Sequence, residues 1–120
     1  MSFTISDSAH PSIRIMKITG ELDDIAMTAD EALGLNAGVP IYVLLDILEM
    51  SIKLPDGFLD TAQKSYFTND NLAHLALFTR SEMFKIIGDM VARLTHRREK
   101  LSAHSTYAAA MAHLEKLAGV

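Results

Sequence analysis

The sequence contains no cysteine, so neither a disulfide framework nor a thiolate metal site can form. This absence fits a reducing compartment. No apolar run reaches the roughly 18 residues of a membrane-spanning helix, and the N-terminus lacks the basic segment and apolar stretch of a signal peptide. The formal net charge of -4 gives no excess of basic charge, which disfavours general nucleic-acid binding. We therefore expect a cytoplasmic protein with no integral membrane segment.

The remaining composition is that of a folded domain. The chain has 120 residues, of which 49% are hydrophobic, enough to build one core and to make disorder improbable. We find no linker, internal repeat or low-complexity stretch. The sequence predicts a single domain over residues 1–120 and carries no signal for a particular oligomeric state.

The first segments alternate apolar and polar residues, a pattern typical of half-buried strands. They are Ser2–Asp7 and Ile13–Leu22, and Pro11 supplies turn chemistry between them. We expect these two strands to form a hairpin with a loop of about five residues.

The next segment, Asp23–Gly38, has helical spacing, with Asp23 or Asp24 as its N-cap and a second start possible at Thr28. It is followed by Ile41–Ile47, a continuous apolar run. Such a run is typical of a central strand that is covered on both faces.

The second half alternates helices and strands. Pro55 suits the first position of a helix because its missing N–H would be unpaired there anyway, and Ser81 can cap the clearest helix. On that helix we expect Met83, Ile87, Met90 and Leu94 to form the buried stripe, joined by Phe84 and Val91. The predicted elements are a helix over 55–67, a strand over 72–79, a helix over 81–100, a strand over 102–107 and a helix over 108–118. Helices that connect successive strands imply a mostly parallel sheet.

The turn after the strand Ile41–Ile47 is the first candidate site. Binding surfaces of open α/β sheets gather beyond the carboxyl ends of the strands, and Met50–Asp56 occupies such an end.

Two stretches carry a family resemblance: "ITGELDDIAMTADEAL" and "VLLDILEMSIKLPDGF". Their shared pieces are Gly20–Asp23 at a strand end, the apolar run that ends at Asp46, Met50-Ser51, and Asp56-Gly57. In this order the chain resembles the STAS domain, the fold of anti-sigma-factor antagonists and of the cytoplasmic tails of sulphate transporters. The second half is similar to the broader SpoIIAA-like group, which overlaps STAS and lipid-transfer folds.

The resemblance implies an α/β fold with a mixed, mostly parallel sheet, an N-terminal hairpin and about four helices. It also implies a protein partner of the serine-kinase-like anti-sigma-factor type. The partner-binding residues that we predict are Asp23, Met50, Ser51, Lys53, Pro55, Asp56 and Gly57.

The chain departs from the family at the phosphorylation switch. In anti-sigma-factor antagonists the helix mouth has the pattern Asp-Ser-Ser/Thr-Gly, and the first serine accepts the phosphate. Aligning Gly57 with the family glycine places Pro55 at the phosphoacceptor position, and proline has no hydroxyl. Ser51 is the nearest remaining hydroxyl. It either accepts a phosphate in a shifted register or, as serines in turns commonly do, bonds the local backbone.

Asp56 follows the missing hydroxyl and has two interpretations. As a hypothesis, it supplies a permanent negative charge at the helix mouth, so that the turn has a fixed partner preference and is not switched. The alternative is an ordinary acidic residue at the start of a helix.

Enzymatic motifs are absent. The sequence has no G-x-S-x-G, phosphate-binding loop or G-x-G-x-x-G. Of the five histidines, His96, His104 and His113 show no metal-ligand spacing and fall on scattered predicted elements, and His74 lies inside a predicted strand. The carboxylate pairs Asp23/Asp24 and Asp56/Asp60 fit first turns of helices better than acid–base pairs. We predict a non-catalytic protein with no cofactor and no metal.

Two functions remain. The first is a regulator that binds another protein through the exposed, polar turn. The second is a SpoIIAA-like module that holds a small apolar or lipid-like ligand between sheet and helices, which requires a cavity lined by methionine and phenylalanine residues of the helix Met83–Leu94.

Overall fold

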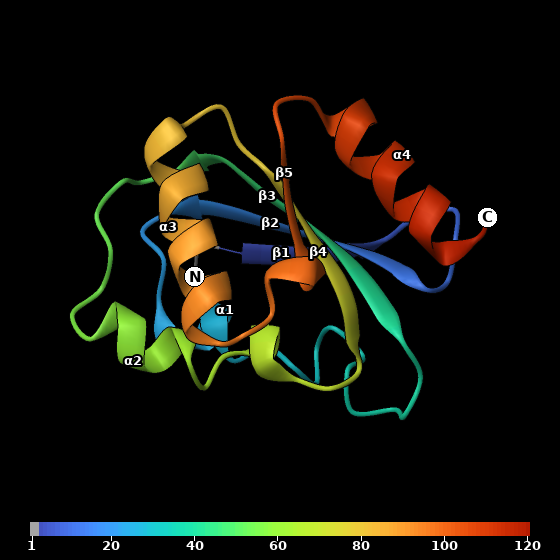
Figure 1. Ribbon diagram of the computed structural model, residues 1–120, viewed down its shortest axis with the longest axis horizontal. Coiled ribbons are helices and arrows are strands. Elements are labelled where there is room, and N and C mark those ends of the chain that lie inside the picture. Colours follow the sequence, from blue (N-terminus) through green and yellow to red (C-terminus); the bar gives the residue numbers. More distant parts are fainter. Residues whose placement is uncertain (1–2) are drawn as a thin grey trace.

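The computed structural model describes residues 3–120, and its centre is a five-stranded sheet in the order β1-β2-β3-β4-β5 (Figure 1). Only β1 and β2 are antiparallel; β2 to β5 are parallel. The strands are β1 (Phe3–Asp7), β2 (Ile13–Gly20), β3 (Ile41–Met50), β4 (Leu72–Phe78) and β5 (Leu101–His104). The predicted α/β architecture, the hairpin and the central position of the Ile41–Ile47 run are confirmed. Ser2, which we placed in the first strand, lies outside the described residues.

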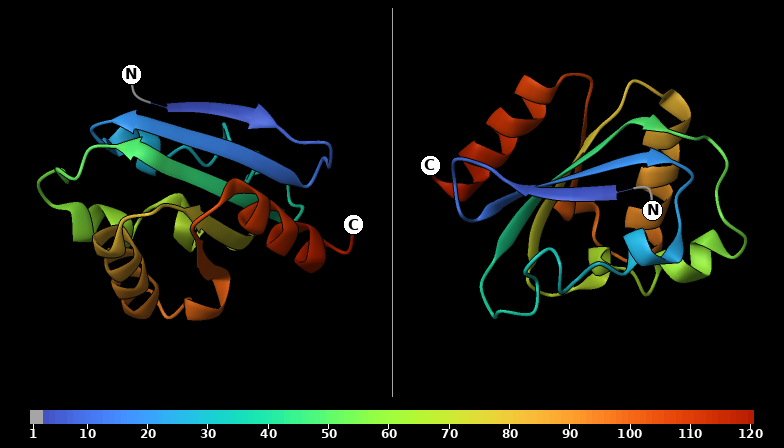
Figure 2. Two further views of the ribbon diagram at one scale, coloured as in Figure 1. Left: turned by 90° about the horizontal axis from the view of Figure 1, so that it is seen from above. Right: turned by 180° about the vertical axis from the view of Figure 1, so that it is seen from behind.

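Helices cover both faces of the sheet. They are α1 (Asp24–Met27), α2 (Phe58–Ala62), α3 (Glu82–Leu94) and α4 (Tyr107–Ala118), with two 3-10 turns, η1 (Tyr66–Thr68) and η2 (Arg98–Lys100). Figures 1 and 2 show α4 apart from α1, α2 and α3. Within residues 3–120, no helix combines the length and the apolar character needed to cross a membrane.

The alternation of side chains along β3 divides the core in two. Val43 and Ile47 belong to the larger cluster, which the segments of α1, α2, η1 and α3 cover, whereas Leu44 belongs to the smaller cluster under α4. Successive strand residues point to opposite faces. The continuous apolar run is therefore explained by burial on both sides.

The predicted helix over Asp23–Gly38 is wrong beyond its first turn. Thr28, proposed as a second start, ends α1, where its hydroxyl donates to the Asp24 carbonyl at 2.7 Å. Leu33 and Leu35 are both fully buried. Residues two apart cannot face the same side of a helix, so burying both leucines requires the irregular turns that the structure shows.

The predicted helix opening at Pro55 is also wrong. Gly57 has a φ of +70° and precedes α2, which starts only at Phe58. The Phe58 N–H donates to the Pro55 carbonyl at 3.2 Å, which closes a four-residue turn whose third position requires a positive φ. Pro55 thus lies in a turn, and α2 is a single turn of helix.

The buried face of α3 differs from the predicted stripe. Phe84 and Ala92 are buried, whereas Met83 and Met90 are each 42% exposed. Ser81 does cap the helix, since its hydroxyl accepts from the Phe84 N–H at 3.2 Å.

Candidate functional site

The carboxyl ends of the four parallel strands meet at one edge of the sheet, and the predicted site residues follow two of these ends. The backbone joins the two loops directly: the Ser51 N–H donates to the Gly20 carbonyl at 2.6 Å. The β2 end with Asp23 and the β3 turn with residues 51–57 are therefore neighbours, as the strand-end argument predicts.

Ser51 has a structural role within the turn. Its hydroxyl oxygen accepts from the Lys53 N–H at 3.2 Å, the local backbone bond weighed above as the alternative to phosphorylation. Lys53 approaches Glu21 of the neighbouring loop at 3.8 Å. Because these side chains are 77% and 66% exposed, solvent screens this ion pair and it contributes little to stability.

The remaining predicted residues separate into exposed and structural ones. Asp56 and Gly57 are exposed on the turn. Asp23 instead caps α1, and its carboxylate accepts from the Ala26 N–H at 2.8 Å. Met50 ends β3 and lines both the groove and the apolar cavity described below. The structure thus assigns different surroundings to residues that the sequence grouped together.

Replacing Asp23 by alanine should lower the free energy of unfolding by about 0.5–2 kcal/mol, because the Ala26 N–H loses its acceptor. Chemical denaturation of the purified variant measures the change. Asp24→Ala is the matched control, because the dipole of the four-residue α1 is small and loss of the Asp24 charge should change stability by about 0.5 kcal/mol or less. An equal loss in the two variants would contradict the cap.

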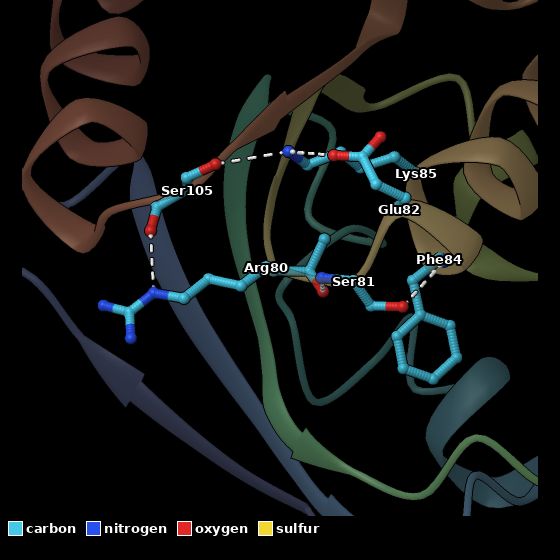
Figure 3. Close-up of polar contacts among 7 residues, drawn as sticks. Arg80, Ser81, Glu82, Phe84, Lys85 and Ser105 are labelled. Atoms are coloured by element: carbon cyan, nitrogen blue, oxygen red, sulfur yellow. Dashed lines mark hydrogen bonds and ion pairs between the residues drawn. The ribbon is translucent and has the colours of Figure 1, made fainter.

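Sequence reasoning missed the part of this edge that follows β4 and β5. Arg80 lies two residues beyond the end of β4, and its Nε donates to the Ser105 carbonyl at 3.3 Å (Figure 3). Lys85 extends from α3 to Ser105, where Nζ lies 3.2 Å from the hydroxyl, and it also pairs with Glu82 at 3.4 Å. The strand-end rule that located the β3 turn would have found Arg80 as well.

A groove lies between the β3 turn and the start of α3. It is lined by Ile47, Leu48, Met50, Ile52, Thr79, Arg80, Ser81 and Phe84. Ile52 is 68% exposed and Leu48 is 40% exposed. The groove therefore combines accessible apolar side chains with the polar segment Thr79–Ser81, a composition suited to contact with another molecule.

A second space, an apolar cavity of about 120 Å³, lies between the sheet and α1, α2 and α3. Nearly all of its lining side chains are apolar, and they include Met27, Met50, Phe58, Phe67, Phe84, Ile87 and Val91. The predicted cavity is confirmed in part: Phe84 of α3 lines it, but the methionines come from α1 and β3. Apolar cavities of this kind offer water no partners.

The polar side chains that line the cavity, Ser65 and Tyr66, are uncharged. Ser65 donates its hydroxyl to the Ala62 carbonyl at 2.7 Å. Burial, with a smaller contribution from Asp30, raises the pKa of Tyr66, so its phenol stays protonated. The cavity therefore fits a neutral, apolar guest.

His104 and His113, predicted to lie on scattered elements, are close together. His74, His104 and His113 come together between α4 and the sheet. Even so, no group of three or more histidine, cysteine or acidic side chains within residues 3–120 is arranged to hold a metal ion.

Comparison with known proteins establishes the fold. No protein-family model matches this sequence, and no curated protein matches it either. A protein of the DUF3478 family with a SpoIIAA-like fold from Shewanella loihica PV-4 has a TM-score of 0.69 at 19% identity over 94% of this chain and 92% of its own. An anti-sigma factor antagonist from Mycobacterium paratuberculosis has a TM-score of 0.57 at 16% identity, covering 95% of each chain. The chain therefore has the STAS-like, SpoIIAA-like fold that the sequence predicted.

Proposed function

We propose that this protein is a non-catalytic regulatory domain of the cytoplasm, formed by residues 1–120, that binds another protein at the carboxyl edge of its sheet. The supporting observation is the exposed apolar surface beside the β3 turn, with Ile52 at 68% exposure next to the charged Lys53. The fold shared with an anti-sigma factor antagonist points to a partner of the serine-kinase-like type.

Regulation by phosphorylation of this turn is not part of the proposal. Pro55 occupies the position that aligns with the phosphoacceptor, and the Ser51 oxygen is bonded to the turn backbone. Asp56 then supplies a permanent charge on the docking surface. The single-turn α2 has only a small dipole, so it does little to favour that charge.

Affinity capture from the source cell, followed by binding measurements with the captured protein, tests the proposal. Ile52→Asp should weaken binding by at least about tenfold, because it places a charge in an apolar contact. Lys53→Glu should mainly slow association and change its salt dependence, as expected for a charge at the rim.

Lys116→Glu, a charge reversal at an exposed position of α4, is the matched control and should bind like the wild type. Identification of the partner as a serine-kinase-like protein supports the regulatory assignment. Unchanged affinity in both Ile52→Asp and Lys53→Glu would place the interface elsewhere. Asp56→Ser then tests the fixed charge separately, and unchanged affinity would leave Asp56 an ordinary turn residue.

The apolar cavity supports a second candidate function, the binding of a small apolar molecule or the end of an acyl chain. Its volume of about 120 Å³ is close to that of an engineered apolar cavity of about 150 Å³ that binds benzene. It is smaller than the roughly 300–1,000 Å³ of drug-sized ligand pockets. Ile47, Met50 and Phe84 line both the cavity and the groove, so a guest in the cavity would contact the wall of the docking surface.

A further inference from the structure

Three histidines from different elements meet where α4 covers the sheet. His113 of α4 lies with its ring centroid 5.2 Å from that of His74 on β4 and 5.1 Å from that of His104 on β5. We refer to these three residues, with Ser102 of β5, as the histidine cluster. It joins the middle of α4 to β4 and β5.

The hydrogen bonds inside the cluster suit neutral rings. The Ser102 hydroxyl oxygen lies 2.9 Å from His74 Nε2 and 2.7 Å from His104 Nε2. A hydroxyl has one proton, so it can donate to one ring nitrogen while it accepts from the other. If both rings are charged, both nitrogens are donors and the hydroxyl proton loses its acceptor.

No carboxylate of the described residues is among the groups that shift the pKa of His74 or His104. His74 is only 5% exposed. Among the described residues, the groups that shift the pKa of His74 or His104 are the other cluster histidines and the Glu99 backbone, not a carboxylate. The charged residues of the adjoining elements include Arg98, Glu99 and Lys100 of η2, with the Lys100 Nζ donating to the Leu72 carbonyl. They also include Arg80 and Lys85, which both contact Ser105.

The proton linkage has a definite sign. Burial, together with His113, lowers the pKa of His74 from 6.5 to about 4, and burial also lowers the pKa of His104. A ring with a lowered pKa binds a proton less readily in the packed state than in the opened one. The stabilisation is thus complete above about pH 6.5 and is lost as the pH falls toward about 4.

The opposite end of α4 is attached by contacts outside the histidine cluster. Glu115 lies 2.9 Å from His10 Nε2, and the Tyr42 hydroxyl donates to the Leu117 carbonyl at 3.3 Å. The C-terminal end of α4 therefore has attachments that do not depend on the histidine cluster.

We propose that the histidine cluster is an acid-sensitive clasp, whose protonation releases Tyr107–His113 from β4 and β5 while the His10–Glu115 end of α4 stays attached. This device goes beyond the proposed function and does not depend on it. It would uncover part of the smaller core cluster, including Ala76 and Phe78, in mildly acidic solution.

Hydrogen exchange of the α4 amides tests the clasp, with rates corrected for the intrinsic effect of pH. From the lowered pKa of His74 alone, protection over residues 107–113 should fall by about thirtyfold between pH 7.5 and pH 5.0. His74→Gln removes the most buried titrating ring and should reduce this fall to less than about threefold. His96→Asn is the matched control, because His96 has a φ of 58° and asparagine tolerates that conformation.

Two further measurements test the clasp without relying on the variant His74→Gln. NMR titration of the wild-type imidazole signals should show His74 and His104 gaining protons as the α4 amides lose protection, which decides the matter even if His74→Gln does not fold. His10→Gln should extend the acid-induced exchange to residues 114–117. An equal fall in protection in wild type and His74→Gln would overturn the proposal, as would a His74 ring that titrates near pH 6.5 while α4 stays protected.

Discussion

Replacing Leu44 by alanine should lower the free energy of unfolding by about 2–5 kcal/mol. Leu44 is fully buried at the centre of β3 and belongs to the cluster that joins the sheet to α4. Its partners there include Ile13, Ala76 and Leu114. Strand backbones on one side and α4 on the other leave little room for collapse, so the shorter side chain leaves a cavity and loses its contacts. A loss of this size is a large fraction of the stability of a small domain.

Leu48→Ala provides the matched control on the same strand. Leu48 is 40% exposed and lies toward the carboxyl end of β3, so its truncation should change stability by about 0.5 kcal/mol or less. Urea denaturation at neutral pH, with similar slopes for the two variants, gives both values. Equal effects of the two substitutions would show that the α4 face of the sheet contributes no more than an exposed position.

The sheet was predictable because its strands carry strong local patterns. The apolar run Ile41–Ile47 predicts a strand that is covered on both faces. The structure places it in the central strand, with side chains in both core clusters. The alternation in the first two strands gave the hairpin, and Asp23 and Ser81 cap α1 and α3. Each of these features depends on residues that are close in sequence.

The segment between α1 and β3 was not predictable, because long-range contacts determine its path. The Asn69 side chain donates to the Asp30 carboxylate at 2.9 Å, and the Asn71 side chain donates to the Leu35 carbonyl at 2.6 Å. These bonds, from residues more than 35 positions away, hold turns that bury Leu33 and Leu35. Helical spacing alone gave the wrong result, since tertiary contacts outweigh weak propensities.

The large apolar residues of α3 predict the wrong buried face for this helix. The helix instead approaches the sheet through its small residues: a Cβ at Gly88 would lie 3.4 Å from the side chains of Leu77 and Leu101. Ala92, one turn later, is 1% exposed. This close approach rotates Met83 and Met90 toward solvent, a result that depends on the facing strands and not on the helix alone.

The sheet edge that carries the candidate site was predictable from the sequence, but the apolar cavity beside it was not. Strand ends gather at one edge of a parallel sheet, which located the β3 turn from sequence. The cavity, in contrast, is the volume left between Met27, Met50, Phe84 and other side chains from separate elements. Its existence depends on how these elements pack together, which no single stretch of sequence encodes.

An apolar guest should stabilise the wild-type protein but not the variant Ala62→Leu. Ala62 is 3% exposed and lines the cavity, so three added carbon atoms occupy the space that a guest needs. With benzene as the probe, at ten times its dissociation constant, wild-type stability should rise by about 1.4 kcal/mol. The variant should show no rise at the same concentration. Chemical denaturation with and without benzene measures both, and native mass spectrometry of the freshly purified protein shows whether a natural guest is retained.

Ala108→Leu is the matched control for this experiment. It makes the same substitution at an exposed position of α4, far from the cavity lining, so stabilisation by benzene should equal that of the wild type. Ala62→Leu must also keep the wild-type circular dichroism spectrum, so that a lost response reports a filled cavity and not an unfolded chain. If benzene stabilises wild type and Ala62→Leu equally, the guest binds elsewhere. If it stabilises neither, the cavity does not accept an apolar molecule of this size, and its role is confined to the packing of α1, α2 and α3 on the sheet.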